Sequence, residues 1–262
     1  MDMIDINYSF LSLSFIISFI EFIYGLHLYS LVDEVSKNTG LRYMVNAIAG
    51  LIYVSIGLSS LALIDELKFN VHEDPEGFYS GCVDNIFGYI VGIAAVAARL
   101  QSTMVLSPLV GIWISLTWLT GFVGQTLAII LYTMYVLYRI VNLVYGLMVS
   151  LGVALLASER TRVISGSLIA SPICLKIYLS WLPLAEPVKT VKDIEFPIKG
   201  IFQEVGDIVS ALWNGQSGLL IDGLKFTEAL VFISFSWSLT VLIILGLSKV
   251  FGGIPHVISS RI

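Results

Sequence analysis

Charged residues are scarce in this sequence, and so are cysteine and histidine. Of the 262 residues only 13% are Asp, Glu, Lys or Arg, whereas about 25% are charged in a soluble domain. The two cysteines, Cys82 and Cys174, are too few for a disulfide framework or a cysteine metal cluster. Of the three histidines only His27 lies within a long apolar run. A haem-binding respiratory subunit, which needs paired transmembrane histidines, is therefore not expected.

An excess of positive charge is also missing. The formal net charge is −5, which argues against a broad basic surface for nucleic acid. The sequence has no nucleophile–base set, phosphate-binding glycine loop or metal-ligand spacing of the kinds that mark enzymes. Ser165, Gly166 and Ser167 follow one another without any hydrolase context. We therefore predict no enzymatic activity, no metal and no cofactor.

What the sequence does have is long apolar runs, since 57% of its residues are hydrophobic. A hydrocarbon core about 30 Å thick is crossed by about 20 helical residues. We predict an all-α integral membrane protein, with about seven transmembrane helices in a single polytopic domain. The first run is too long for a signal-peptide core and lacks a basic start, so we expect a retained anchor. The expected spans are about 8–32, 43–64, 85–104, 108–131, 132–157, 163–182 and 227–247.

The stretch over residues 105–158 is the most apolar part of the chain. It has a single charge, Arg139, and a single proline, Pro108. Two arrangements fit its length: two spans joined by a short hinge, or one helix that projects well beyond the membrane. The hinge would lie near residues 120–125 or 132–135. The prediction of seven spans takes the two-span arrangement.

The distribution of Lys and Arg predicts the orientation, because these residues in short loops favour the cytoplasm. With the N-terminus outside and the C-terminus inside, Arg99 lies toward the inner end of the third span. Failure of residues 105–157 to form two spans would reverse the assignment of every later segment. The cytoplasmic cations in this orientation are Lys37, Arg42, Arg160, Arg162, Lys249 and Arg261.

One long polar region, residues 183–225, is expected outside the membrane and contains a helical pattern. Apolar residues recur at three- and four-residue steps after Pro197, and Lys199, Glu204 and Asp207 fall on the other face. This spacing predicts an amphipathic helix over residues 198–213. The helix would lie on the outer leaflet, or would cover a cavity between spans as a lid or plug.

Four ionisable residues fall within or near the predicted spans: Glu21, Arg99, Arg139 and Lys176. Such groups are costly in a bilayer unless they pair, face the protein interior or reach water. A Glu21–Arg139 pair would join two helices, or these groups would line a hydrated path. Arg160 and Arg162 lie in a predicted cytoplasmic turn, either as topology signals or as contacts for a partner.

The pattern of residues 105–183 resembles a known class of membrane proteins. Two long apolar spans lead to Gly152-Val153-Ala154-Leu155-Leu156-Ala157, followed by Glu159-Arg160-Thr161-Arg162. The following span then begins with small residues at Ser165 and ends in Leu182-Pro183. This pattern is similar to the polytopic inner-membrane component of type IV secretion and conjugation machines, more specifically to the archaeal DNA-import version (the CedA type). The resemblance covers about a third of the chain.

The resemblance implies a membrane channel, or a channel scaffold, through which DNA passes, with import as the direction. The implied partners are a cytoplasmic hexameric ATPase, small membrane or pilin-like subunits, DNA in transit and membrane lipids. The motor must be a separate chain, because this sequence has no nucleotide-binding signature. Two other readings stay open: a non-catalytic subunit of another membrane complex, and a small-solute or ion transporter.

Overall fold

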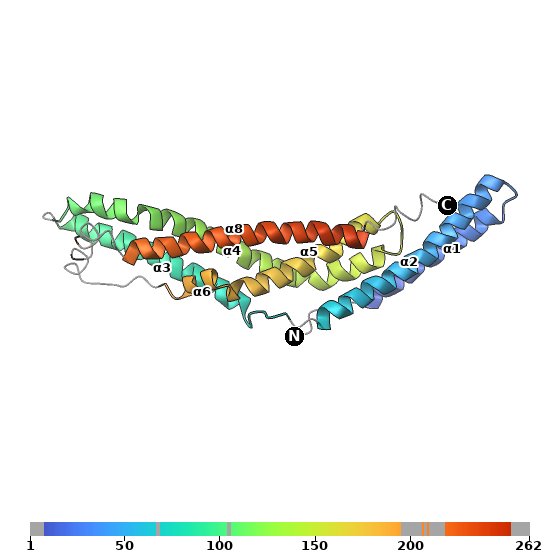
Figure 1. Cartoon of the computed structure of the whole chain (residues 1–262), viewed down its shortest axis with the longest axis horizontal. Coiled ribbons are helices and arrows are strands. Elements are labelled where there is room, and N and C mark those ends of the chain that lie inside the picture. Colours follow the sequence, from blue (N-terminus) through green and yellow to red (C-terminus); the bar gives the residue numbers. More distant parts are fainter. Residues whose placement is uncertain are drawn as a thin grey trace. The chain divides into compact units, whose positions relative to one another are not determined.

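The computed structural model describes residues 8–66, 69–103, 106–194, 206, 209 and 218–252. Every regular element in these ranges is a helix (Figure 1). The elements are α1 (Tyr8–Tyr29), α2 (Glu34–Glu66), α3 (Pro75–Ser102), α4 (Leu109–Leu155), α5 (Arg162–Trp181), a short 3-10 helix η1 (Leu182–Leu184), α6 (Glu186–Lys192) and α8 (Gly218–Gly252). Six of them, α1 to α5 and α8, are long and apolar enough to cross a membrane. The predicted all-α class is confirmed for the described residues, and six of the helices could span a membrane by their length and composition.

The predicted division into spans 108–131 and 132–157 is not found, because both belong to one helix. Helix α4 runs without interruption for 47 residues, which is roughly 70 Å at about 1.5 Å per residue. No proline breaks it after its start. The hydroxyls of Thr126 and Thr133, near the predicted hinges, donate to the carbonyls of Phe122 and Ile129 at 2.9 and 2.8 Å. Such side-chain bonds are compatible with a continuous helix.

The third long helix begins earlier than predicted, at Pro75 rather than near residue 85. Asp74 caps it, since its Oδ1 accepts a hydrogen bond of 2.9 Å from the backbone N–H of Gly77. Proline at the first helical position follows naturally, because its missing N–H would have had no partner there. Residues 75–84, which lie between the predicted second and third spans, are therefore the first turns of α3. Pro172 lies inside α5, which continues to Trp181.

The chain forms two compact units. Unit 1 comprises residues 1–70, 140–178 and 239–262, and unit 2 comprises residues 71–139 and 179–238. Helices α4, α5 and α8 each contribute to both units.

Unit 1 contains α1 and α2, which run side by side as an antiparallel hairpin (Figure 1). The two helices touch through small residues: a Cβ added to Gly25 would lie 2.7 Å from the carbonyl oxygen of Gly40. Helix α2 then packs on α4 and α5. The buried cluster of this packing comprises Val54, Leu61, Tyr145, Val149, Val153, Leu156, Ala157, Ile169 and Ile173.

Unit 2 contains α3, α6 and parts of α4, α5 and α8. The hydroxyl of Tyr79 donates to the carbonyl of Leu179 at 2.7 Å, and the side-chain amide of Asn85 donates to the carbonyl of Lys192 at 2.7 Å. Because Lys192 ends α6, the second bond ties that helix to α3. Helix α6 lies in the predicted polar loop 183–225. The amphipathic helix predicted over residues 198–213 lies outside the described residues, except for positions 206 and 209, which are helical.

Candidate functional site

The turn between α4 and α5, residues 156–161, is held by side chains that bond the last carbonyls of α4. Thr161 Oγ1 donates to the carbonyl of Leu155 at 2.7 Å, and Arg162 Nε donates to the carbonyl of Leu156 at 3.0 Å. The end of a helix normally leaves such carbonyls without intrahelical partners. These bonds give the turn a fixed geometry rather than that of a loose connection.

Helix α2 passes directly beside this turn. A Cβ added to Gly50 would collide with the carbonyl of Ala157, and one added to Gly57 would lie 2.8 Å from Leu156 Cδ1. Glycine at position 50 therefore permits a backbone approach that no other residue type allows without movement. Through this approach α2 brings its polar residues close to the turn.

Five side chains from α1, α2 and the turn form hydrogen bonds and an ion pair here. Ser158 Oγ donates to Glu21 Oε1 at 2.7 Å, and Asn46 Nδ2 donates to Glu159 Oε2 at 2.7 Å. Arg42 Nη2 lies 3.9 Å from Glu159 Oε1. With three further residues, these make up what we call the turn cluster: Glu21, Arg42, Tyr43, Asn46, Ser158, Glu159, Arg160 and Arg162.

The two arginines of the turn differ in environment. Arg160 is exposed, and its Nη2 donates to the hydroxyl of Tyr43 at 3.4 Å. Arg162 is 3% exposed, with its guanidinium carbon 4.3 Å from the ring centroid of Tyr53, a cation–π geometry. Its Nη2 finds no hydrogen-bond partner within the described ranges. Arg162 therefore packs inside unit 1, and Arg160 is the arginine of the turn that a partner can reach.

The end of α8 also reaches the turn cluster. A Cβ added to Gly252 would lie 2.7 Å from the carbonyl oxygen of Arg162, and one added to Gly166 would collide with the carbonyl of Ser248. Lys249, in the last turn of α8, is exposed. Exposed cations near the turn therefore come from α2 (Arg42), from the turn itself (Arg160) and from the last turn of α8 (Lys249).

The other predicted intramembrane residues lie elsewhere. Lys176, in unit 1, has its Nζ 4.2 Å from the ring centroid of Tyr145. Arg139, in unit 2, forms an ion pair of 3.1 Å with Glu76 and donates to the hydroxyl of Tyr135 at 3.2 Å. Within its own unit, Glu21 accepts from Ser158, and Arg139 pairs with Glu76. Arg99 is exposed in the last turn of α3.

One polar group in unit 2 was missed by sequence reasoning. Tyr89 donates to Asp222 Oδ2 at 3.0 Å, and Lys225 Nζ lies 3.5 Å from Asp222 Oδ1. Asp222 and Lys225, together with Thr190, Asp193 and Ile194, line a cavity of about 220 Å³. The sequence does carry a signal, since Asp and Lys three residues apart are neighbours on a helix. They were missed because residues 218–225 were predicted to belong to the polar loop.

Across the described ranges there is no group of three or more His, Cys, Asp or Glu side chains placed to hold a metal ion. The chemistry that the turn cluster offers is recognition of anionic groups by arginine, on a frame that buried contacts hold in place. No protein-family model, curated protein or solved structure matches this chain.

Proposed function

We propose that this chain is a membrane scaffold or channel component of a DNA-translocation machine, and that the turn cluster is its contact for a cytoplasmic partner. The observation that carries the proposal is the gathering of exposed cations around a fixed turn. Arg160, Arg42 and Lys249 come from three separate parts of the sequence. The resemblance of residues 105–183 to the membrane component of type IV secretion machines favours this function.

The electrostatics of the turn cluster favour an anionic partner. Glu159 is engaged by Asn46 and Arg42, and Glu21 accepts from Ser158. The acidic groups of the cluster are therefore occupied within the protein, whereas Arg160 points to a neutral tyrosine hydroxyl. An acidic surface of a hexameric ATPase, or the phosphate backbone of DNA, supplies a negatively charged partner for Arg160.

The same contacts support an orientation with the turn cluster in the cytoplasm, since Lys and Arg near short loops favour that side. Arg42 and Tyr43 touch the turn, so the start of α2 and the α4–α5 turn belong on one side of the membrane. Six helices that each crossed once would separate them. Because α4 is one continuous helix and cannot cross twice, we infer that one of α2, α3 and α4 does not cross the membrane. The remaining five crossings place the residues before α1 outside and the residues after α8 inside.

The overall negative charge of the chain favours a scaffold over a complete DNA-lined pore. In this role the chain positions other components: a separate motor at the turn cluster and small membrane subunits along the helices. A non-catalytic role in another membrane complex uses the same surfaces with different partners.

A second candidate, a small-solute or ion transporter, is favoured by one observation. The cavity of about 220 Å³ is a polar site where Asp222 and Lys225 of the long apolar helix α8 meet Thr190 of α6 and Asp193. Ionisable residues of this kind mark substrate or ion pathways in many membrane proteins.

Affinity purification of the whole chain in mild detergent tests the proposal, with all co-purifying chains identified by mass spectrometry. We expect a motor ATPase that is retained by the unmodified chain and lost from an Arg160→Glu variant. A Lys189→Glu variant, which changes an exposed cation on α6, is the matched control and should retain it. Recovery of redox subunits, or of no partner, contradicts the proposed function.

A further inference from the structure

Hydroxyl groups on the helices of this chain usually bond their own helix. Ser55 donates to the carbonyl of Leu51, Ser115 to Gly111 and Ser234 to Leu230, at 3.0, 2.9 and 2.8 Å. This bond to the carbonyl four residues earlier is the ordinary solution for serine in an apolar helix. It needs no partner from outside the helix.

Ser18 of α1 departs from this pattern. The residue is 2% exposed, and its Oγ finds no hydrogen-bond partner in the part of the chain that the structure describes. A buried hydroxyl without a partner costs free energy, because it has lost water and gained nothing in exchange. A hydrogen-bond partner for Ser18 from outside the described residues would remove this cost.

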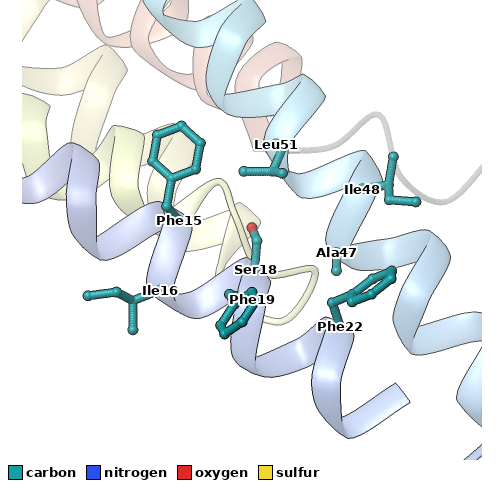
Figure 2. A pocket seen from close by; sticks show the side chains of 8 residues that line it. All are labelled: Phe15, Ile16, Ser18, Phe19, Phe22, Ala47, Ile48 and Leu51. Carbon is teal, nitrogen blue, oxygen red and sulfur yellow. The ribbon is translucent and has the colours of Figure 1, made fainter. Parts of the chain in front are cut away.

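Ser18 lies in an apolar groove between α1 and α2, which has a volume of about 380 Å³. Figure 2 shows its hydroxyl between the two helices, with Phe15, Phe19 and Phe22 on the α1 side and Leu51 on the α2 side. Both walls face outward: Phe19 of α1 is 63% and Ile48 of α2 54% exposed. The remaining lining residues are Ile16, Ala47 and Ile48.

We propose that this groove binds a transmembrane helix of another protein chain, and that this helix carries a hydrogen-bond acceptor facing Ser18. An apolar groove with one polar atom at its base fits the recognition of a helix by its side chains. A lipid acyl chain fills the apolar volume but has no acceptor for the hydroxyl. A helix with Ser, Thr, Asn or Gln at this depth supplies both, and such interhelical bonds recur in membrane proteins.

A second copy of this chain does not meet the same requirement by a symmetric contact. The exposed α1 face beside the groove carries Phe15, Phe19 and Phe22 together with Ile16 and Ile23. None of these side chains has a hydrogen-bond acceptor. The acceptor that pairing of two grooves offers is the other copy's Ser18, so one of the two hydroxyls would still lack an acceptor.

The proposed occupant deepens the proposed function and rests on it for its identity as a small membrane subunit of the same machine. The binding itself rests on the groove and on Ser18 alone. The proposed function and the groove can therefore fail separately. If the chain takes no part in DNA transfer but the groove still contacts a transmembrane helix, the function is wrong and the groove proposal stands.

Photo-crosslinking in intact native membranes tests the proposal. A photoreactive amino acid replaces Phe19, which lines the groove, or its neighbour Ile20, which does not; these residues are 63% and 61% exposed. We expect the Phe19 probe to link to one position within a transmembrane segment of one other protein, beside a polar residue, and the Ile20 probe not to do so. Ser18→Ala should lower the yield from the Phe19 probe about threefold, the effect of one interhelical hydrogen bond.

Four outcomes overturn the proposal. They are products with lipid only, products with a second copy of this chain, products with a soluble protein, and equal yields of one protein product from both positions. An unchanged yield in Ser18→Ala also contradicts the role of the hydroxyl. The amount of each variant in the membrane is measured alongside, so that yields are compared per molecule inserted.

Discussion

Ser158 donates a hydrogen bond of 2.7 Å to the carboxylate of Glu21, and this bond joins the α4–α5 turn to α1. The two residues lie 137 positions apart in the sequence, and the bond joins a neutral hydroxyl to an acidic side chain. The bond places an acidic residue of an apolar helix beside the arginines of the turn.

Glu21→Leu should lower the free energy of unfolding by about 1–3 kcal/mol, because it leaves the half-buried Ser158 hydroxyl without an acceptor. Glu21→Gln keeps an acceptor oxygen in the same place and should remain close to the unmodified protein. Thermal unfolding in a single detergent measures both. Equal stability of Glu21→Leu and the parent protein would show that the bond does not hold the turn.

Gly50→Ala should destabilise the protein by about 1–3 kcal/mol, the usual cost of inserting a methyl group into a packed contact. The added Cβ would meet the carbonyl of Ala157. Gly88→Ala is the matched control, because a Cβ there has no neighbour within 4 Å, and alanine is favoured over glycine inside a helix. The prediction fails if the two variants unfold at the same temperature.

The two arginines of the turn should respond differently to truncation. Arg162→Ala removes the bond to the carbonyl of Leu156 and the contact with Tyr53, so we expect a loss of about 1–3 kcal/mol. Arg160→Ala should stay within about 0.5 kcal/mol, as for most surface positions. Thermal unfolding compares the pair directly, and a larger loss for Arg160→Ala would reverse the assignment of roles.

Single cysteines at positions 37 and 249 should react with a membrane-impermeant thiol reagent from the same side, the cytoplasm. Both positions are exposed in unit 1, and the two native cysteines are buried, so background labelling should be low. Labelling of Lys37→Cys and Lys249→Cys from opposite sides would mean that each long helix crosses once, and the proposed orientation would then be wrong.

The fold class could be predicted because apolar runs with few charges directly report helices in a membrane. The continuity of α4 could not be predicted in the same way. An apolar residue looks the same whether it faces lipid or another helix, so composition does not show where one span ends and the next begins. Pro108 lies before α4, and no later proline marks a break up to Leu155. A continuous helix was one of two arrangements that the sequence allowed.

The site was foreseen in its residues but not in its pairings. Glu21, Arg160 and Arg162 were identified as unusual, yet the pairing of Glu21 with Ser158 depends on how α1 packs against the turn. The pair Glu76–Arg139 was easier to predict from the sequence, because Asp74 before Pro75 is a recognisable helix start. Reading that signal places Glu76 in the first turn of a helix rather than in a loop.

DNA transfer between cells that carry a double charge reversal, Arg160→Glu with Lys249→Glu, tests the proposed function most directly. The control is Lys189→Glu with Lys192→Glu, which changes the charge equally on α6, where both lysines are exposed. We predict that the first variant loses transfer while its labelling pattern and membrane level stay unchanged, and that the control transfers normally. Transfer by the first variant with correct topology would contradict the account, and an inverted topology would show that these cations act only as orientation signals.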